Sequence, residues 1–284
     1  PLHDQKAADQ ASTEASARMV AIDMSKPEEF RIKRLGTAMA TALFAPQGNL
    51  PIKNYREADF PEGVAKLGGM PYVEQLNAEL DRRVERKSAE PWPCRGCVIQ
   101  CHNRVTVEHE KYGYVGKGPE YESFAMMGFN VMIDDMKAVA YAGELANKYC
   151  MDTISLGGVL AWAFESYEKG LIGKDDCYGL DLEWGNADAM VELTKKIGER
   201  AEGLGHLLGE GTAIASRMLG GGSQDWAVQM KGQEIAAHAD QAVPELAGMM
   251  DLVTQLSARQ GPPPGMDEAV ARASSVLDRA IDVL

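Results

Sequence analysis

Apolar residues return at intervals of three and four positions along most of this 284-residue chain, and strand-like alternation is scarce. That period is typical of helices with one buried face. It predicts a mainly α, multihelical fold with helices over 25–44, 73–90, 121–132, 135–149, 155–169, 187–202, 206–219 and 243–258. Ser25, Asp134 and Asn186 are expected to begin three of these helices, because their short polar side chains can accept hydrogen bonds from free backbone amides.

The C-terminal part of the sequence has a different character. Residues 261–265 read Gly-Pro-Pro-Pro-Gly, a helix-breaking run that predicts a linker. Beyond it, one apolar stripe over 266–284 predicts an amphipathic helix that docks on the core or on another chain. The expected organisation is a helical domain over 1–260, followed by the linker and C-terminal helix over 261–284.

Composition narrows the function classes. The chain is 45% hydrophobic, which is enough to bury a sizeable core, and its 42 acidic against 29 basic residues give a net charge of −13. An acidic surface repels phosphate backbones, so we expect no nucleic-acid partner. No apolar run approaches the roughly 20 residues that a membrane span needs, and the first residues lack the layout of a secretory signal. A soluble, cytoplasmic protein is expected.

Three of the five cysteines, Cys94, Cys97 and Cys101, fall within eight residues. Spacings of three and four let one tight loop direct three thiolates at a common centre, as a cuboidal iron–sulfur cluster or a tetrahedral zinc ion requires. The spacing leaves both metals open, with His102 as a candidate zinc ligand, and three space-filling cysteines are the plainer alternative. The next stretch, 104–114, predicts a small hairpin.

Two carboxylates, Glu120 and Glu122, flank Tyr121 directly before an apolar run. Glu120 is expected at a helix start, where the free amides favour a carboxylate. Glu122, if it is buried next to a cofactor, would have the raised pKa that suits a general acid or base. Periodicity alone favours a capping or solvated role over catalysis for both.

The segment 147–155 joins the end of one predicted helix to the start of the next. Asp152 and Ser155 are natural N-caps, and capping is their ordinary explanation. The same free amides and short polar side chains could instead hold a polar heterocycle with several donors and acceptors.

Taken in order, these segments resemble the tungsten-containing aldehyde:ferredoxin oxidoreductase family. The resemblance covers roughly residues 1–235 and corresponds to the middle, mostly helical part of such an enzyme. Further matching pieces are Gly36-Thr37, Leu50-Pro51-Ile52-Lys53-Asn54-Tyr55, Tyr167 to Ile172, Glu183-Trp184-Gly185-Asn186 and Lys231-Gly232. Each piece is weak alone, but their order and spacing make the match specific.

The resemblance implies a set of cofactors. The cysteine loop would supply three of four ligands to a [4Fe-4S] cluster, which decides for iron–sulfur over zinc. The cluster would lie beside a tungsten or molybdenum ion held by two pterins, a site that could be incomplete in this chain. Glu122 stands where the family has an acidic residue near the metal, thought to help move protons, and is therefore the expected catalytic residue.

The resemblance also implies a pterin-binding turn. The 147–152 segment matches the family's Asp-x-x-Gly-Leu-Asp pattern, which implies that Asn147, Met151 and Asp152 face one pterin. Two positions depart from the pattern: Asn147 replaces Asp and Cys150 replaces Gly.

The implied reaction is oxidation of a small aldehyde with water to a carboxylic acid, with two electrons passing through the cluster to ferredoxin or another electron-transfer subunit. The alternative is a non-catalytic iron–sulfur electron-transfer or scaffold subunit without a complete tungstopterin site. The fourth cluster ligand would then be Cys150, Cys177, His102 or a residue of a partner chain, and the chain could form a homo-oligomer. A helical, zinc-binding interaction module is the third possibility.

Overall fold

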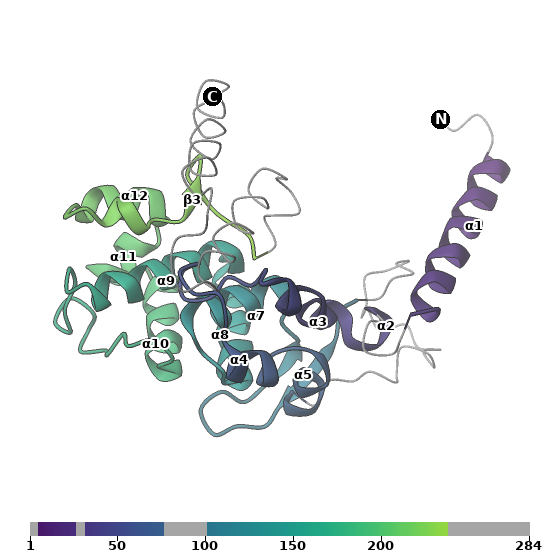
Figure 1. The fold of residues 1–284 in the computed structure, drawn as a ribbon, viewed down its shortest axis with the longest axis horizontal. Coiled ribbons are helices and arrows are strands. Elements are labelled where there is room, and N and C mark those ends of the chain that lie inside the picture. The colour runs from purple at the N-terminus through teal and green to yellow at the C-terminus, as the bar shows by residue number, and fades with distance from the viewer. Residues whose placement is uncertain (1–4, 27–31, 77–100, 238–284) are drawn as a thin grey trace, which may run out of the picture.

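The computed structural model of the chain describes residues 5–26, 32–76 and 101–237 (Figure 1). Helices dominate the secondary structure of these residues, which confirms the predicted mainly α, multihelical class. The α-helices are α1 Gln5–Met24, α2 Ile32–Leu35, α3 Ala40–Phe44, α4 Pro61–Lys66, α5 Gly69–Gln75, α7 Tyr121–Met127, α8 Met136–Tyr149, α9 Thr153–Glu168, α10 Ala187–Gly198, α11 Leu204–Leu208 and α12 Thr212–Leu219. The 3-10 helices are Gly36–Met39, Ala45–Gln47, Phe129–Val131 and Ser223–Trp226, and the strands are β1 Arg104–Val107, β2 Tyr114–Lys117, β3 Gln229–Met230 and β4 Gln233–Glu234.

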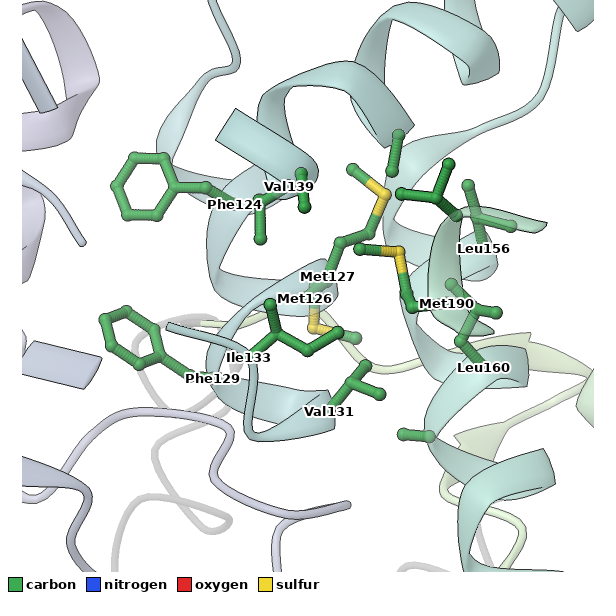
Figure 2. Packing of buried hydrophobic residues seen from close by; sticks show 14 of the residues in the cluster. Phe124, Met126, Met127, Phe129, Val131, Ile133, Val139, Leu156, Leu160 and Met190 are labelled. Atoms are coloured by element: carbon green, nitrogen blue, oxygen red, sulfur yellow. The ribbon is translucent and has the colours of Figure 1, made fainter. Parts of the chain in front are cut away.

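Helix α9 lies at the centre of the core. Every residue from Leu156 to Ser166 is buried, so this helix is covered on all sides, as its high apolar content requires. Helix α7 packs along α9, and α10 packs against α8. Figure 2 shows Met127 of α7 and Met190 of α10 beside Leu156 and Leu160 of α9, in a cluster of side chains that are almost completely buried.

Short polar side chains begin the long helices, but not always the predicted ones. Asp135, not Asp134, is the N-cap of α8: its Oδ1 accepts hydrogen bonds from the backbone amides of Lys137 at 2.9 Å and Ala138 at 3.2 Å. Asp134 forms an ion pair with Lys66 instead. Asn186 begins α10 as predicted, and its Oδ1 accepts from the Ala189 amide at 3.1 Å.

Several predicted helices are shorter or divided in the structure. The predicted helix 25–44 ends at Phe44 as expected, but the left-handed φ of +62° at Gly36 breaks its described part into α2, a 3-10 turn and α3. The predicted helix 206–219 is two helices, α11 and α12, because Gly211 with φ +83° separates them. Helix α1, which Figure 1 shows extending away from the folded body, was not expected, since its sequence carries no apolar stripe.

The predicted hairpin follows the cysteine loop and is confirmed. Strands β1 and β2 pair antiparallel, with Arg104 opposite Lys117 and Val107 opposite Tyr114. Val105 and Val107 are buried, so one face of β1 packs on the core. The hairpin therefore fixes where the chain leaves the cysteine loop.

Some predictions fall on residues outside the described part of the chain. These are most of the helix over 73–90, of which only the part up to residue 76 is described and its first residues belong to α5, together with the helix over 243–258, the linker 261–265 and the C-terminal helix. The division into 1–260 and 261–284 therefore stays a prediction. In the described ranges, no helix combines the length and apolar composition of a membrane span.

Candidate functional site

The last cysteine of the predicted metal-binding loop lies beside the Gly36-Thr37 turn. Cys101 is half-buried and comes shortly before β1, whereas Cys94 and Cys97 lie outside the described residues. A Cβ atom on Gly36 would collide with the Cys101 carbonyl oxygen and approach the side-chain amide nitrogen of Asn103 to 2.9 Å. The turn and the end of the cysteine loop are therefore packed backbone against backbone, which only glycine allows.

Glu120 does not cap its own helix, contrary to the ordinary expectation for a carboxylate at a helix start. No side-chain cap bond forms at this N-cap of α7. The Thr37 hydroxyl donates to Glu120 Oε2 and accepts from the Tyr121 amide at 2.9 Å. The other oxygen, Oε1, lies 3.5 Å from His102 Nε2. Glu120 thus joins the Gly36-Thr37 turn to the residue that follows Cys101.

Glu122, the expected catalytic residue, is partly buried in the first turn of α7. Its Oε2 accepts a hydrogen bond of 2.8 Å from the backbone amide of Ala237. The Tyr55 hydroxyl donates to the carbonyls of Ile235 at 2.9 Å and Ala236 at 3.1 Å, so both side chains hold the same short segment. Burial, together with the charge of Glu122, raises the pKa of Tyr55, which keeps its hydroxyl protonated.

The helix starts that carry the two predicted site segments lie side by side. Ser123 Oγ of α7 and Thr153 Oγ1 of α9 are 2.9 Å apart and share a hydrogen bond. Because Ser123 follows Glu122 and Thr153 follows Asp152, this bond brings the predicted catalytic segment against the predicted pterin-binding turn.

The turn between α8 and α9 lines an open pocket of about 330 Å³. Asp152 is the N-cap of α9, where its Oδ1 accepts from the Ser155 amide at 2.8 Å, which confirms its capping role. The remaining walls come from the ends of α10 and α11 and the start of α12. The lining residues are Tyr149, Cys150, Met151, Asp152, Ser155, Leu156, Val159, Ile197, Gly198, Arg200, Leu208, Gly209 and Gly211.

The structure brings together only part of the predicted pterin set. Met151 and Asp152 line the pocket, whereas Asn147 lies exposed on the last turn of α8, outside its walls. Cys150, at the position of the family glycine, has a left-handed backbone with φ 56° and ψ 38°. The turn therefore keeps the backbone path that a glycine would favour.

The candidates for a fourth cluster ligand differ in their surroundings. Cys177 is fully buried, and burial, followed by the charge of Asp176, raises the pKa of its thiol to about 12. Cys150 is exposed at the pocket, and His102 faces Glu120. Within the described part of the chain, no three His, Cys, Asp or Glu side chains are grouped as a metal site would need.

A buried carboxylate that the sequence pattern did not reveal binds the residues on both sides of Tyr55. Glu165 of α9 is 1% exposed, yet its carboxylate accepts from Asn54 Nδ2 at 2.7 Å and lies 3.3 Å from Arg56 Nη1. The same Glu165 lies 3.4 Å from Lys169 Nζ. The Lys53-Asn54-Tyr55 motif is visible in the sequence, but its contact with Glu165 is not. A single Glu in an apolar helix does not indicate which residue, here 111 positions earlier, will bind it.

The comparisons with known proteins agree with one another. The sequence matches the family described as "Aldehyde ferredoxin oxidoreductase, domains 2 & 3" over residues 13–255. It is 32% identical over 212 residues to the tungsten-containing aldehyde ferredoxin oxidoreductase of Pyrococcus horikoshii, covering 73% of this chain and 32% of that protein. The corresponding protein of Pyrococcus abyssi matches at the same identity and coverage. The chain thus spans about a third of the length of these relatives.

Two further matches come from proteins with other names. The "Aliphatic sulfonate oxidoreductase, WOR-like subunit" of Pyrococcus furiosus is 33% identical over 152 residues, 52% of this chain and 24% of that protein. A solved structure, the "Active site complex BamBC of Benzoyl Coenzyme A reductase in complex with 1,5 Dienoyl-CoA", superposes with a TM-score of 0.50 at 22% identity, over 67% of this chain and 27% of that chain. This last likeness concerns the fold alone.

Proposed function

The chain belongs to the aldehyde ferredoxin oxidoreductase family, and from this premise we propose that it forms the helical part of a tungstopterin oxidoreductase. The proposed reaction converts a small aldehyde and one water into a carboxylic acid, two electrons and two protons. The electrons would leave through a [4Fe-4S] cluster to ferredoxin or another electron-transfer subunit in the cytoplasm. The chain would work with partner chains or as a homo-oligomer.

One observation carries this proposal: an ion-pair contact, a hydrogen bond and the continuity of the chain bring all three predicted site segments together. His102, next to Cys101, faces Glu120, and Glu120 is two residues before Glu122. The Ser123–Thr153 bond then joins this segment to the turn that ends at Asp152. Segments that are scattered along the sequence therefore lie next to one another, as a cluster beside a pterin requires.

Two features of the described residues support these cofactors, namely the position of Cys101 and the pocket at the 150–152 turn. Cys101, with Cys94 and Cys97 from outside the described part, would hold the cluster. Met151 and Asp152 would contact a pterin from the 330 Å³ pocket, whose lining includes both polar residues, such as Ser155, and apolar residues, such as Val159. When bound, the tungsten–pterin group supplies the two-electron redox chemistry, and the protein supplies binding, orientation and proton transfer.

Glu122 is the residue that we propose to move a proton. Its position in the first turn of α7 is fixed by the Ala237 amide, and Ala237 is itself 3% exposed, so water is kept from that side of the carboxylate. Tyr55 stays protonated and orients the 235–236 backbone around it. Glu122 would accept one of the two protons that aldehyde oxidation releases.

Glu122→Gln tests this role in the anaerobically purified chain with its partners. Glutamine keeps an oxygen that accepts from the Ala237 amide but cannot take up a proton. We expect unchanged tungsten, pterin and iron contents with aldehyde-dependent viologen reduction about 10²-fold lower. Glu62→Gln, on the exposed side of α4, is the matched control and should reduce viologen at the wild-type rate. Wild-type turnover in Glu122→Gln would contradict the role.

The alternative function is a non-catalytic iron–sulfur electron-transfer or scaffold subunit. Two substitutions in the 147–152 turn favour it. Asn147 replaces the family's Asp and faces solvent, and Cys150 replaces Gly. Metal and pterin analysis of the purified chain separates the two functions. Tungsten and pterin together support the enzyme, whereas iron without either supports the relay.

A further inference from the structure

The hydroxyl of Thr37 lies where three segments of the chain meet. It donates to Glu120 Oε2 and accepts from the Tyr121 amide at 2.9 Å, so both of its hydrogen-bonding functions are used. The Tyr121 amide belongs to the first turn of α7, where amides have no carbonyl acceptor within their own helix, and the N-cap side chain of Glu120 does not accept from it. A residue 84 positions earlier therefore completes this helix start.

The segment from Cys101 to Asn103 is held from both sides at this point. On one side Gly36 packs against the Cys101 carbonyl, and Asn103 Nδ2 donates to the Leu35 carbonyl at 3.4 Å. On the other side the Gly118 amide donates to the Asn103 carbonyl at 2.8 Å. Glu120 adds a contact of 3.5 Å to His102 Nε2. These contacts hold the exit of the cysteine loop from both sides.

We propose that Thr37 and Glu120 are positioning residues for the iron–sulfur cluster. Thr37 fixes the Glu120 carboxylate, and Glu120 in turn fixes His102 and, through the backbone, the Cys101 thiolate. The inference rests on the proposed function, because it requires that Cys101 is a cluster ligand.

We call the contacts that join Thr37, Glu120 and His102 the clamp. The physical effect expected of it is slower loss of the cluster. A ligand that is already oriented loses less conformational freedom when the metal binds, and outer contacts of this kind commonly change metal affinity by about 10–100-fold. Releasing the clamp should let Cys101 detach more often, so iron would leave faster and the cluster would sample several geometries.

Thr37→Val tests the clamp in the full chain purified anaerobically. Valine keeps the shape of threonine and removes both hydrogen bonds, and Thr37→Ser restores them. Thr194→Val is the matched control, because it removes another buried hydroxyl, which donates to the Met190 carbonyl at 2.9 Å in α10. Three properties are measured: the rate of iron release to a ferrous chelator, the paramagnetic spectrum of the reduced cluster, and the midpoint of thermal unfolding.

We expect Thr37→Val to release iron about 10-fold faster and to show broadened resonances, with Thr37→Ser near wild type. Thr194→Val should unfold at a lower temperature but keep the wild-type iron release and spectrum. Equal iron release from Thr37→Val, Thr194→Val and wild type would overturn the proposal. If Thr37→Val does not fold, Glu120→Gln takes its place with the same expectation. A wild-type chain that holds no iron would reject the proposed function itself, which is a different result.

Discussion

Cys150 occupies a backbone position that suits glycine. It follows the last residue of α8 with φ 56° and ψ 38°, and its amide donates back to the carbonyls of Ala146 and Asn147. The next amide, Met151, also donates to Ala146, at 2.9 Å. This is how a helix ends on a left-handed residue, and a side chain at that position costs roughly 1–2 kcal/mol. The sequence showed that Cys replaces the family's Gly, but not that the backbone path is retained.

Cys150→Gly should therefore stabilise the chain. Relief of the left-handed strain outweighs the extra freedom that glycine gives to the unfolded chain, and we expect about 0.5–1 kcal/mol more unfolding free energy in urea. The exposed cysteine side chain contributes little packing. Cys150→Ala is the control: it removes the sulfur but keeps the strain, so it should match wild type. A destabilised glycine variant would show that the Cys150 sulfur has a structural role.

At the scale of elements, the contact between α7 and α9 depends on Gly157. A Cβ atom at this position would lie 2.5 Å from Met126 Cβ and 2.6 Å from the Met126 carbonyl oxygen. The two helices can approach this closely only because α9 has no side chain there. The same contact brings Ser123 to Thr153, so the site surface depends on it.

Gly157→Ala should separate the two helices and destabilise the fold by about 1–3 kcal/mol. The matched control is Gly143→Ala in α8, where the new Cβ would meet Met127 Cε at 3.6 Å, an ordinary contact. That control should be neutral or up to about 1 kcal/mol more stable, since alanine favours the helix. Urea unfolding of both variants measures the difference, and equal stabilities would contradict close packing at Gly157.

The β1–β2 hairpin is tied to α10 by charge. Lys111 Nζ lies 2.8 Å from Asp188 Oδ2, and the Tyr112 hydroxyl donates to Asp188 Oδ1. The Lys111 hydrogen bond, followed by that of Tyr112, holds the pKa of the Asp188 carboxyl below its ordinary value. A depressed pKa means that this pair stabilises the fold fully above the unfolded-state pKa, about 4, and that the contribution disappears as pH falls further.

Asp188→Asn should thus flatten the acid side of the stability profile. Urea midpoints measured at pH 7, 4 and 3 should fall less steeply in the variant than in wild type, because the variant has no proton to take up at this position. Asp175→Asn, an exposed site between α9 and α10, removes the same charge away from the hairpin and should keep the wild-type slope. Parallel profiles for Asp188→Asn and wild type would show that the ion pair contributes nothing.

For the whole molecule, the positions of the helices could be predicted from the sequence better than the contacts between distant segments. The 3.6-residue period marked α8 and α10 because each buries one apolar face, and apolar residues at helical spacing marked α9, which is buried on all sides. The helix ends shifted where glycine or a second capping residue competed. Helix α1 was not predicted because its sequence has no apolar stripe. The meeting of Thr37 with Glu120 was not predictable, since periodicity encodes local geometry and says nothing about partners 83 positions apart.

The proposed function depends on which metal Cys94, Cys97 and Cys101 bind, and we propose that it is iron. The most direct measurement is iron and sulfide analysis, with paramagnetic resonance of the dithionite-reduced chain, on anaerobically purified wild type and Cys101→Ser. We predict about four iron and four sulfide per wild-type chain and a reduced-cluster signal that is lost in Cys101→Ser. A colourless wild-type chain that contains zinc in place of iron would contradict it.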